Sequence, residues 1–389
     1  GKEKHMSYDF YMPTRIVSQD ESSADSCVKT HSTIFALGKK AVIVCGKHSA
    51  RACGALDDVE SVLKKLGIDY IIYDKVTENP PVSTCYAGGR AAIEAGCDFV
   101  IGIGGGSPLD ASKAVAVYAA NPDFAPDDAF SDNIRAALPI IAIPTTAGTG
   151  SEANPFSVMT LDGKNVKKTM KTPFAYPRAA ILDPRYTETL SRETTVSTAL
   201  DAFCHCAESY LSPKSTDISR MFAVDGAKKI YNSLDAIDKL GSVADDPECL
   251  KLLRYGLMTG ANAGGIAINT TGTGFNHPLG YNLTLYKGLP HGRACGAFMS
   301  AYYYYNRTTE LGAKLIDDFC DAIGVEWAKV AADIVRWSDV KIGSAYGNAL
   351  APDEIELYVN NVKGAGNYKN SPYVINPDEM RDIYQKLFG

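Results

Sequence analysis

The stretch VIGIGGGSPLDASKA, residues 100–114, decides the fold class of this chain. An apolar run leads into three glycines and then into Ser107 and Pro108, residue types that favour the first positions of a helix. Asp110, three residues after Ser107, predicts a capping box at the same helix start. A strand, a glycine turn and a helix in this order bring backbone N–H groups and the positive end of a helix dipole close to an anion. The stretch therefore predicts a diphosphate site in an α/β fold.

The glycine turn differs from the G-x-G-x-x-G fingerprint, because Ser107 occupies a place where that register needs glycine. It is interpreted as a phosphate turn of another kind, the alternative being a turn that serves only tight packing of strand against helix. A second turn, PTTAGTGSE at residues 144–152, offers hydroxyl groups to ribose, phosphate or amide groups. Two such turns favour a nucleotide. The residues concerned are Gly104, Gly105, Gly106, Ser107, Thr145, Thr146 and Thr149.

The rest of the first half repeats this alternation of short apolar runs and helical patterns. The runs cover residues 40–46, 69–74, 98–106, 138–151 and 179–184. They predict βαβ units on a mostly parallel sheet, whereas the segments after Pro184 have helical spacing throughout. We predict an α/β dinucleotide-binding domain over residues 1–184 and an all-helical domain over residues 185–389, with the active site in the cleft between them. Residues 1–6, GKEKHM, are interpreted as a tag remnant.

Composition narrows the class of partner. The 389 residues carry a formal net charge of −6 without a block of lysines or arginines, which argues against nucleic acid or an acidic membrane surface. The sequence has no signal core and no run of roughly 18 apolar residues, so we expect no membrane association. Its ten cysteines include no C-x-x-C pair, which predicts neither a zinc ribbon nor a disulfide framework and fits a reducing cytoplasm.

A third loop, residues 46–49, bears on the choice of nucleotide. Proteins that select NAD commonly place an acid at the end of a strand to hold the ribose 2′-hydroxyl, and here Gly46 stands at that place. Gly46, Lys47 and Ser49 offer space, a cation and a hydroxyl donor to a 2′-phosphate. The loop therefore predicts NADP(H) in preference to NAD(H). The alternative is that Lys47 is a solvated loop lysine.

Metal-ligating residue types gather in the second half. Asp201 and His205, in ALDAFCHCAESY at 199–210, lie four residues apart in a helical pattern and leave from one face. His277 and His291 lie in GFNHPLGYNLTLYKGLPHGRACG at 274–296, each beside proline or glycine. One carboxylate and three imidazoles suit a divalent first-row metal such as Fe(II) or Zn(II).

Two alternatives to this ligand set stay open on the sequence. Cys204 and Glu208 share the helix face of Asp201 and His205, and Cys204 is a further candidate ligand. An Asp–His pair four residues apart also occurs as a hydrogen-bonded pair inside a core, with no metal. The metal site therefore depends on whether the other two histidines converge on this face.

Taken together, these motifs resemble the iron-containing alcohol dehydrogenase family, particularly its NADPH-dependent butanol-dehydrogenase-type branch. The resemblance runs through GKHSARACGALDDV, GGGSPLDASKA, PTTAGTGSE, AAILDP, LDAFCHCAESY and HPLGY…GLPHG, in family order and at family-like spacing. It implies metal ligation by Asp201, His205, His277 and His291, and a pyrophosphate loop at Gly104, Gly105, Gly106 and Ser107. It further implies cofactor contacts from Thr145, Thr146, Thr149, Asn79 and Lys167. Many relatives have a second histidine where this chain has Tyr281, so the resemblance leaves Tyr281 as a tentative proton relay.

The sequence thus predicts a metal-dependent alcohol dehydrogenase or aldehyde reductase that transfers a hydride between NADP(H) and a primary alcohol or aldehyde. Fe(II) is the favoured metal and Zn(II) the alternative, and a cytoplasmic homodimer is expected. The tyrosine-rich segment at 300–307 fits either an interface or a buried helix. Other functions left open are a glycerol-like polyol dehydrogenase, a lyase related to dehydroquinate synthase, and a non-catalytic protein that binds nucleotide or metal. The lyase would need a basic pocket, and no arginine cluster lies near the histidines in the sequence.

Overall fold

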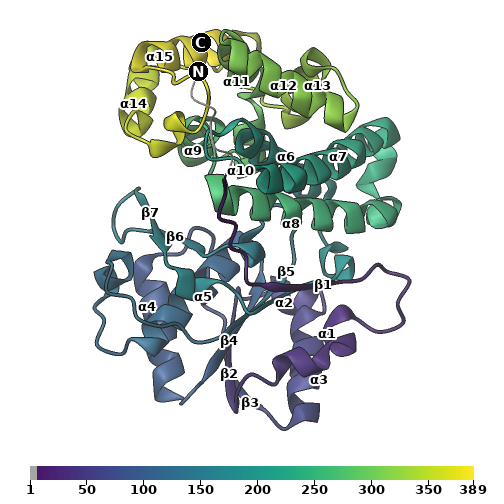
Figure 1. Cartoon of the computed structure of the whole chain (residues 1–389), viewed down its shortest axis with the longest axis vertical. Helices are drawn as coiled ribbons and strands as arrows, with labels where there is room; N and C mark the ends of the chain where they lie inside the picture. Colours follow the sequence, from purple (N-terminus) through teal and green to yellow (C-terminus); the bar gives the residue numbers. More distant parts are fainter. Residues whose placement is uncertain (1–6) are drawn as a thin grey trace. The chain divides into compact units, whose positions relative to one another are not determined.

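The computed structural model describes residues 7–389, which form two compact units (Figure 1). The sheet unit comprises Pro13–Thr195 and Asp235–Gly265, and the helical unit comprises residues 7–12, Val196–Leu234 and Ile266–Gly389. The single boundary at residue 184 stays a prediction, since contacts within the chain group residues 235–265 with the sheet. The interpretation of residues 1–6 as a tag remnant concerns residues outside the described part of the chain.

A six-stranded parallel sheet forms the centre of the sheet unit, in the order β1-β8-β5-β4-β2-β3. The strands are β1 (Arg15–Ser18), β2 (Lys40–Cys45), β3 (Asp69–Tyr73), β4 (Phe99–Gly104), β5 (Ile140–Pro144) and β8 (Ala179–Leu182). The five apolar runs predicted as strands are confirmed as β2, β3, β4, β5 and β8. Each run is flanked by glycine, proline or polar residues, so its ends are marked in the sequence.

The two faces of the sheet bury alternate residues of each strand. Ile43 of β2 joins a core with α1 (Cys27–Thr30) and α3 (Ala55–Leu66), whereas Val42 and Val44 join a core with α4 (Val82–Glu94) and α5 (Gly106–Ala120). This alternation is the two-residue period of a strand. The sheet is therefore covered by helices on both faces, as Figure 1 shows, and the loops that follow its strands are left at the edges.

Strand order identifies the edge at which a nucleotide would bind. β2 is hydrogen-bonded to β3 on one side and to β4 on the other, so the direction of winding reverses between β2 and β4. In open parallel sheets, ligands bind beyond the carboxyl ends of the strands at such a reversal. Residues 46–49 follow β2, and the glycine turn follows β4.

The predicted capping box at Ser107 is wrong. Helix α5 begins at Gly106, with Gly105 as its N-cap. The Ser107 hydroxyl oxygen instead accepts the N–H of Asn79 at 3.1 Å. The Asp110 carboxylate accepts the Ser151 hydroxyl at 2.5 Å and the Val158 N–H at 3.0 Å. Partners from other segments thus replace the local bonds that the sequence spacing suggested.

A two-stranded antiparallel hairpin, β6 (Phe156–Thr160) with β7 (Lys167–Lys171), was not predicted. Its turn contains Asp162 and Gly163, and Gly163 has a φ of 69°. Lys113 of α5 reaches the hairpin and the segment before it, because its ammonium group donates to the Phe156 carbonyl at 2.8 Å and to the Ser151 hydroxyl at 2.7 Å. The hairpin is therefore attached to the helix that follows the glycine turn.

After β8, every described element is helical, which confirms the predicted class of the second half. The α-helices are α6 (Arg192–Leu211), α7 (Asp217–Leu240), α8 (Arg254–Thr271), α9 (Asn276–Lys287), α10 (His291–Gly296), α11 (Met299–Arg307), α12 (Glu310–Ile323), α13 (Trp327–Ser338), α14 (Pro352–Val362) and α15 (Pro377–Phe388). The tyrosine-rich segment is α11, which buries Tyr302 and Tyr303 and exposes Tyr304. Among the described residues, none of these helices is long and apolar enough to cross a membrane.

Candidate functional site

Three histidines of the helical unit converge on one carboxylate oxygen. Asp201 and His205 lie one turn apart on α6, His277 lies in the first turn of α9, and His291 begins α10. The Nε2 atoms of His277, His205 and His291 lie 3.2, 3.3 and 3.3 Å from Asp201 Oδ1. Asp201 and His205 are 4% and 5% exposed, whereas the His291 side chain is 43% exposed, so the cluster is buried at α6 and reaches solvent at His291.

The three distances from Asp201 Oδ1 to the imidazole nitrogens fit a bound divalent cation. Ligand atoms at 2.0–2.1 Å from a tetrahedral metal lie about 3.4 Å from one another, close to the separations found here. Asp201 and the neighbouring Glu208 are both buried carboxylates, and their two negative charges would be balanced by a divalent cation. A carboxylate oxygen with imidazole nitrogens suits Fe(II) or Zn(II), so the residues present fit the metal that the sequence predicts.

The electrostatics of the cluster keep Asp201 ionised and His205 neutral. Burial alone would raise the pKa of the Asp201 carboxyl, but the imidazoles of His205 and His291 and hydrogen bonds from His277 and His291 hold it well below its usual value. Burial lowers the pKa of His205 to about 4, against the opposing pull of Asp201. A neutral imidazole and an ionised carboxylate are the forms that bind a metal.

His277 behaves differently because it lies between two carboxylates. Its Nδ1 is 2.6 Å from Glu208 Oε2, while its Nε2 faces Asp201. Burial would lower its pKa, but Glu208 and Asp201 raise it to about 10. Glu208 also accepts the backbone N–H of Asn276 at 2.9 Å, which fixes the carboxylate. Glu208 therefore orients the imidazole from its far side and keeps the proton on Nδ1 when Nε2 binds a cation.

We expect metal affinity at this site to rise with pH. In the metal-free protein His277 keeps its proton up to a pH of about 10, so a cation that binds Nε2 must displace that proton. For Mn(II), which prefers oxygen and nitrogen ligands, the dissociation constant should fall about tenfold for each pH unit between pH 6 and 8. Titration calorimetry at several pH values measures this slope. Glu208→Gln should flatten it, and a wild-type constant that does not change with pH would contradict the assignment.

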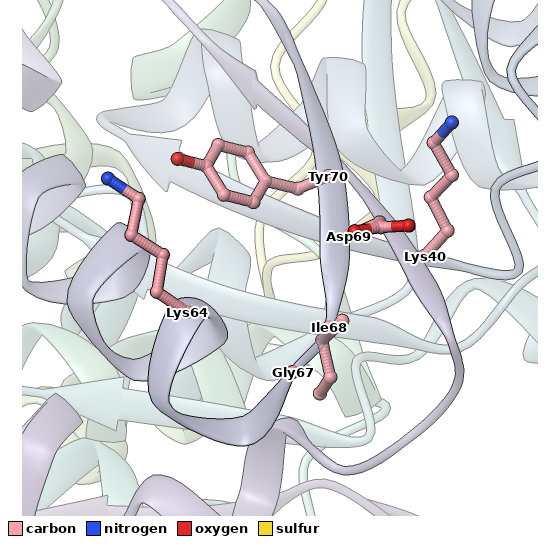
Figure 2. A pocket seen from close by; sticks show the side chains of 6 residues that line it. All are labelled: Lys40, Lys64, Gly67, Ile68, Asp69 and Tyr70. Carbon is pink, nitrogen blue, oxygen red and sulfur yellow. The ribbon is translucent and has the colours of Figure 1, made fainter.

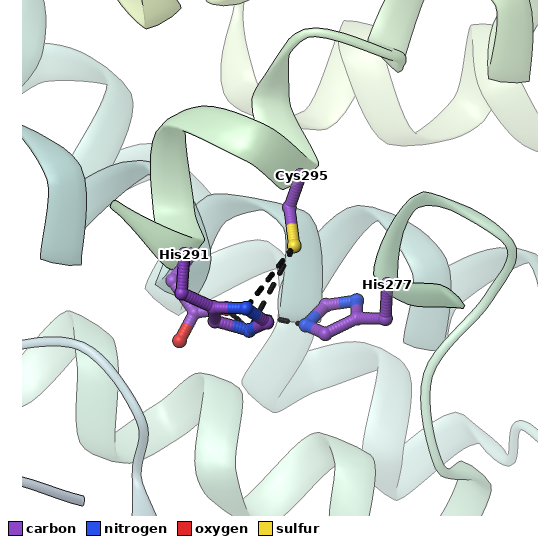
Figure 3. Close-up of side chains that lie close together, drawn as sticks. His277, His291 and Cys295 are labelled. Carbon is purple, nitrogen blue, oxygen red and sulfur yellow. Dashed lines mark hydrogen bonds and ion pairs between the residues drawn. The ribbon is translucent and has the colours of Figure 1, made fainter. Parts of the chain in front are cut away.

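Cys204, the other candidate ligand on this helix face, lies elsewhere. The Cys204 sulfur is 3.9 Å from the side-chain nitrogen of Asn276, and burial raises the pKa of its thiol well above the usual value. Cys295, which was not predicted as a ligand, lies closer to the histidines. Donor atoms of Asp201, His277, His291 and Cys295 all lie within 4.8 Å of one another. Figure 3 shows the Cys295 sulfur beside the His291 ring, with His277 facing it.

A glycine brings the helices that carry these donors together. A Cβ atom built on Gly292 would lie 1.6 Å from the carbonyl oxygen of Ser197 and 2.9 Å from the backbone nitrogen of Asp201. Only a residue without a side chain allows this approach of α10 to α6. Gly292 therefore places His291 against the turn of α6 that carries Asp201, a role that the sequence analysis did not assign.

The candidate cofactor loops of the sheet unit also meet. Cβ atoms built on Gly105 and Gly106 would lie 3.3 and 2.7 Å from the side chains of Thr146 and Thr149. Gly104 has a φ of 151°, a conformation that favours glycine. Thr145 is buried, and its N–H donates to the Gly104 carbonyl at 2.9 Å. The two predicted turns therefore form one surface at the carboxyl ends of β4 and β5.

Asn79 and the loop after β2 complete this edge of the sheet. Asn79 has a positive φ of 52°, and its N–H contacts the Ser107 hydroxyl, which ties its loop to the glycine turn. Gly46 leaves room beside its own backbone, because a Cβ there would meet only the Val76 carbonyl at 3.4 Å and the Ser49 hydroxyl at 3.9 Å. Lys47 and Ser49 are exposed. The parallel pairing of β2 with β4 places this loop next to the glycine turn.

Two further residues, Lys167 and Tyr281, were predicted to belong to the site. Lys167 begins β7, and its positive charge contributes to lowering the pKa of the Asp110 carboxyl against the stronger effect of burial. Tyr281 lies one helical turn after His277 on α9 and is partly buried. Burial raises the pKa of its hydroxyl. Its role as a proton relay stays a prediction.

A cavity of about 390 Å³ lies at the other edge of the sheet. It is lined by Lys40, Lys64, Gly67, Ile68, Asp69 and Tyr70 (Figure 2). Lys40 and Asp69 begin β2 and β3, whereas the candidate cofactor loops follow the ends of strands. The cavity is therefore separate from the predicted nucleotide site.

Comparison with known proteins relates both halves of the chain to one family. A family model described as iron-containing alcohol dehydrogenase matches residues 13–184, and one for the C-terminal part of the Fe-containing alcohol dehydrogenase family matches residues 195–388. The long-chain primary alcohol dehydrogenase AdhA of Thermoanaerobacter ethanolicus is 34% identical over 67% of this chain and 64% of its own length, so the match spans less than two thirds of that relative. The NADPH-dependent butanol dehydrogenase of Clostridium saccharobutylicum is 28% identical over 90% of this chain and 92% of its own length.

Solved structures show the same architecture. An iron-containing alcohol dehydrogenase from Thermotoga maritima has a TM-score of 0.85 at 32% identity, covering 98% of this chain and 100% of its own. NADH-dependent butanol dehydrogenase A from the same organism has a TM-score of 0.80 at 25% identity, with 99% of each chain covered. The names of these similar proteins include both NADPH and NADH, so the likeness leaves the choice of nucleotide open.

Proposed function

This chain belongs to the iron-containing alcohol dehydrogenase family, and from that premise we propose that it is a metal-dependent enzyme that reduces aldehydes with NADPH and oxidises primary alcohols with NADP⁺. The observation that supports this most is the convergence of three imidazole nitrogens on Asp201 Oδ1 at 3.2–3.3 Å. Asp201, His205, His277 and His291 are the proposed metal ligands, with Fe(II) the favoured ion and Zn(II) the alternative.

The metal and the nicotinamide would supply one part of the chemistry, and residues of the chain supply the other. When bound, the metal polarises a carbonyl or stabilises an alkoxide, and the nicotinamide gives or takes the hydride. Asp201 supplies the negative charge that holds the cation, and Glu208 holds the proton of His277 on Nδ1, which leaves Nε2 able to bind. The low exposure of Asp201 and His205 strengthens the electrostatic interactions of these two side chains.

Reduction of an aldehyde also consumes one proton, which joins the oxygen as hydride joins carbon. Tyr281 is proposed as a relay for this proton, because it lies one turn after His277 on the same helix face. The raised pKa of its hydroxyl keeps Tyr281 protonated near neutral pH, which suits a donor. A ribose hydroxyl or water is the alternative donor, and Tyr281→Phe distinguishes them through the pH profile of kcat.

Nucleotide binding is assigned to the carboxyl edge of the sheet. Gly104, Gly105, Gly106 and Ser107 at the start of α5 would receive the pyrophosphate, and Thr145, Thr146, Thr149, Asn79 and Lys167 would contact the remainder. Gly46, Lys47 and Ser49 would receive the 2′-phosphate of NADP(H), since no acid follows β2 to repel it. The predicted placement of the active site in a cleft between domains stays a prediction.

Gly46→Asp is expected to shift the nucleotide preference toward NADH. A carboxylate at this position would repel a 2′-phosphate and accept a hydrogen bond from a 2′-hydroxyl, a change of about 1.5–3 kcal/mol. The ratio of kcat/KM for NADPH to that for NADH should therefore fall about tenfold or more. Steady-state assays with both nucleotides measure it. Gly364→Asp, in a position with open space around it, is the matched control for charge, and equal ratios in the two variants would contradict the assignment.

The experiment that tests the function is NADPH oxidation with butyraldehyde before and after chelation, followed by anaerobic repletion with Fe(II) or Zn(II). Activity that is lost with the metal and restored by it supports the proposal. Nucleotide binding without aldehyde-dependent turnover would instead identify a non-catalytic binding protein. A preference for glycerol and other vicinal diols over primary alcohols would identify a polyol dehydrogenase of the same superfamily.

We also propose that the protein is a cytoplasmic homodimer. All ten cysteines are free thiols, which fits a reducing compartment. The oligomeric state is tested by sedimentation of the full chain, with a mass of twice 41.7 kDa as the expected result.

A further inference from the structure

Lys113 is a fully buried cation to which the proposed function gives no role. It lies in the middle of α5, among the buried apolar residues of that helix. Its ammonium group donates to the Ser151 hydroxyl at 2.7 Å, the Phe156 carbonyl at 2.8 Å and the Asn154 side-chain oxygen at 3.2 Å. An ammonium group has three N–H donors, so these three acceptors satisfy it completely. Burying a charge is costly unless its hydrogen bonds are made in this way.

Carboxylates on two elements balance the charge of Lys113. Asp110, one turn earlier on α5, has an oxygen 3.9 Å from the Lys113 nitrogen and accepts the Ser151 hydroxyl at 2.5 Å. Glu152, in the segment after β5, is buried and adds a further negative charge. The positive charge of Lys167 on β7 acts on Asp110 from the hairpin. Ser151 therefore bonds both to the buried cation and to its counter-ion.

These bonds connect the glycine turn, residues 104–107, to the threonine turn, residues 144–152. Gly106 begins α5 about two turns before Lys113. The Ser151 N–H donates to the Thr149 hydroxyl oxygen at 3.3 Å, and the Thr149 side chain lies against Gly106, where an added Cβ would be 2.7 Å from it. A closed path thus runs from Gly106 along α5 to Lys113 and returns to Gly106 through the threonine turn.

We propose that Lys113 is a positioning residue for the nucleotide, and that its ammonium group holds the threonine turn at the distance from the glycine turn that one bound cofactor requires. This inference rests on the proposed function, which assigns both turns to NADP(H). Lys113 acts without contacting the cofactor, since all three of its donors are used within the chain. Methionine, which is unbranched and apolar, would fill the space inside α5 without making these bonds.

Lys113→Met tests this through nucleotide affinity, measured directly in the folded full-length protein. The dissociation constant for NADPH, measured by its fluorescence at pH 7 and well below the unfolding midpoint, should rise at least about tenfold, because small displacements of binding groups have large effects. The dissociation constant for Zn(II) should not change, since the candidate metal donors belong to the helical unit and Lys113 to the sheet unit.

Leu63→Ala is the matched control for stability. Leu63 is fully buried on α3, in the core that covers the opposite face of the sheet from α5. Its truncation should lower the unfolding midpoint, as large-to-small substitutions in a core do, and leave the dissociation constant for NADPH unchanged. Weaker nucleotide binding in Lys113→Met but not in Leu63→Ala would support positioning and exclude general destabilisation as the cause.

The pH profile supplies a second measurement that a purely structural role would not affect. Burial lowers the pKa of Lys113 to about 8, against the opposing effects of Asp110 and Glu152. Above this pH the neutral amine has only two N–H donors for three acceptors, so wild-type affinity for NADPH should weaken between pH 7 and 9.5. The ratio of the Lys113→Met constant to the wild-type constant should shrink about fivefold over this range, the effect of one hydrogen bond.

The outcomes separate this inference from the proposed function. A Lys113→Met constant equal to that of the wild-type protein, or a ratio that does not change with pH, overturns the inference and leaves the proposed function intact. A wild-type chain that binds no NADPH overturns both. Where Lys113→Met does not fold, Asn154→Ala removes one of the three acceptors and should raise the constant about fivefold, and an unchanged constant in that variant overturns the inference.

Discussion

Asp201→Asn is expected to lower kcat/KM for aldehyde reduction about 1,000-fold and to remove most of the bound metal. The substitution keeps the shape of the side chain but removes the charge on the oxygen that three imidazole nitrogens approach at 3.2–3.3 Å. A metal supplies several kcal/mol of transition-state stabilisation, and 4 kcal/mol corresponds to about 1,000-fold in rate. Steady-state kinetics and elemental analysis of the purified protein measure the two effects together.

The matched control for this prediction is Asp225→Asn. Asp225 lies on α7 in an exposed ion pair with Lys229 at 2.8 Å, so the same change of charge there should alter neither metal content nor rate. Full metal content and unchanged kcat/KM in Asp201→Asn would contradict the proposed ligand set. Loss of rate with full metal content would restrict Asp201 to a role in the reaction rather than in metal binding.

Gly292→Ala is expected to destabilise the helical unit and to disrupt metal binding, although the substitution adds only one methyl group. That group would lie 1.6 Å from the Ser197 carbonyl oxygen, so α10 must move away from α6. Overpacking of this kind costs about 1–3 kcal/mol. Because α10 begins with His291, the same movement separates its Nε2 from Asp201, and metal affinity should fall at least about tenfold.

Thermal unfolding with and without added Zn(II), together with zinc titration, measures both effects of Gly292→Ala. Gly364→Ala is the control, because a Cβ at position 364 meets nothing within 4 Å. An unfolding midpoint and a zinc affinity equal to those of Gly364→Ala would show that α10 accommodates the methyl group. The close approach would then have no part in building the site.

The fold was predictable where local sequence and tertiary structure agree. The buried strands are short apolar runs ended by glycine, proline or polar residues, and all five predicted runs are strands. Strand β1 was missed because it has four residues, of which only Val17 is buried, so it lacks both the length and the pattern of the others. The β6–β7 hairpin carried a recognisable signal, since Asp162-Gly163 is a common hairpin turn.

Local spacing failed where distant segments supply the partners. Ser107 and Asp110 have the sequence of a helix cap, but bonds to Asn79, Ser151 and Val158 take their polar atoms. Such bonds depend on loops that are far apart in the sequence, and the periodic pattern of a sequence does not predict them. The capping prediction therefore failed because it considered only nearby residues, whereas residues from distant segments form the bonds.

The same distinction holds for the candidate metal site. Asp201 and His205 are placed together by one turn of helix, so their proximity follows from the sequence. Their meeting with His277 and His291 depends on how α9 and α10 pack against α6, which the sequence alone does not specify. Cys295 could have been noticed, because it follows His291 at the same four-residue interval that singled out Asp201 and His205. The role of Gly292 could not have been predicted, because it depends on one close contact with the Ser197 carbonyl of another helix.

The candidate donors to the metal all belong to the helical unit, and the glycine turn, the threonine turn and residues 46–49 belong to the sheet unit. Under the proposed function, mutations that change the nucleotide therefore fall on residues that carry no metal donor, and mutations that change the metal leave the nucleotide loops unaltered. Natural selection can consequently adjust the two requirements in separate steps. Under the proposed function, a change of metal or a change of nucleotide needs substitutions in only one of the two units.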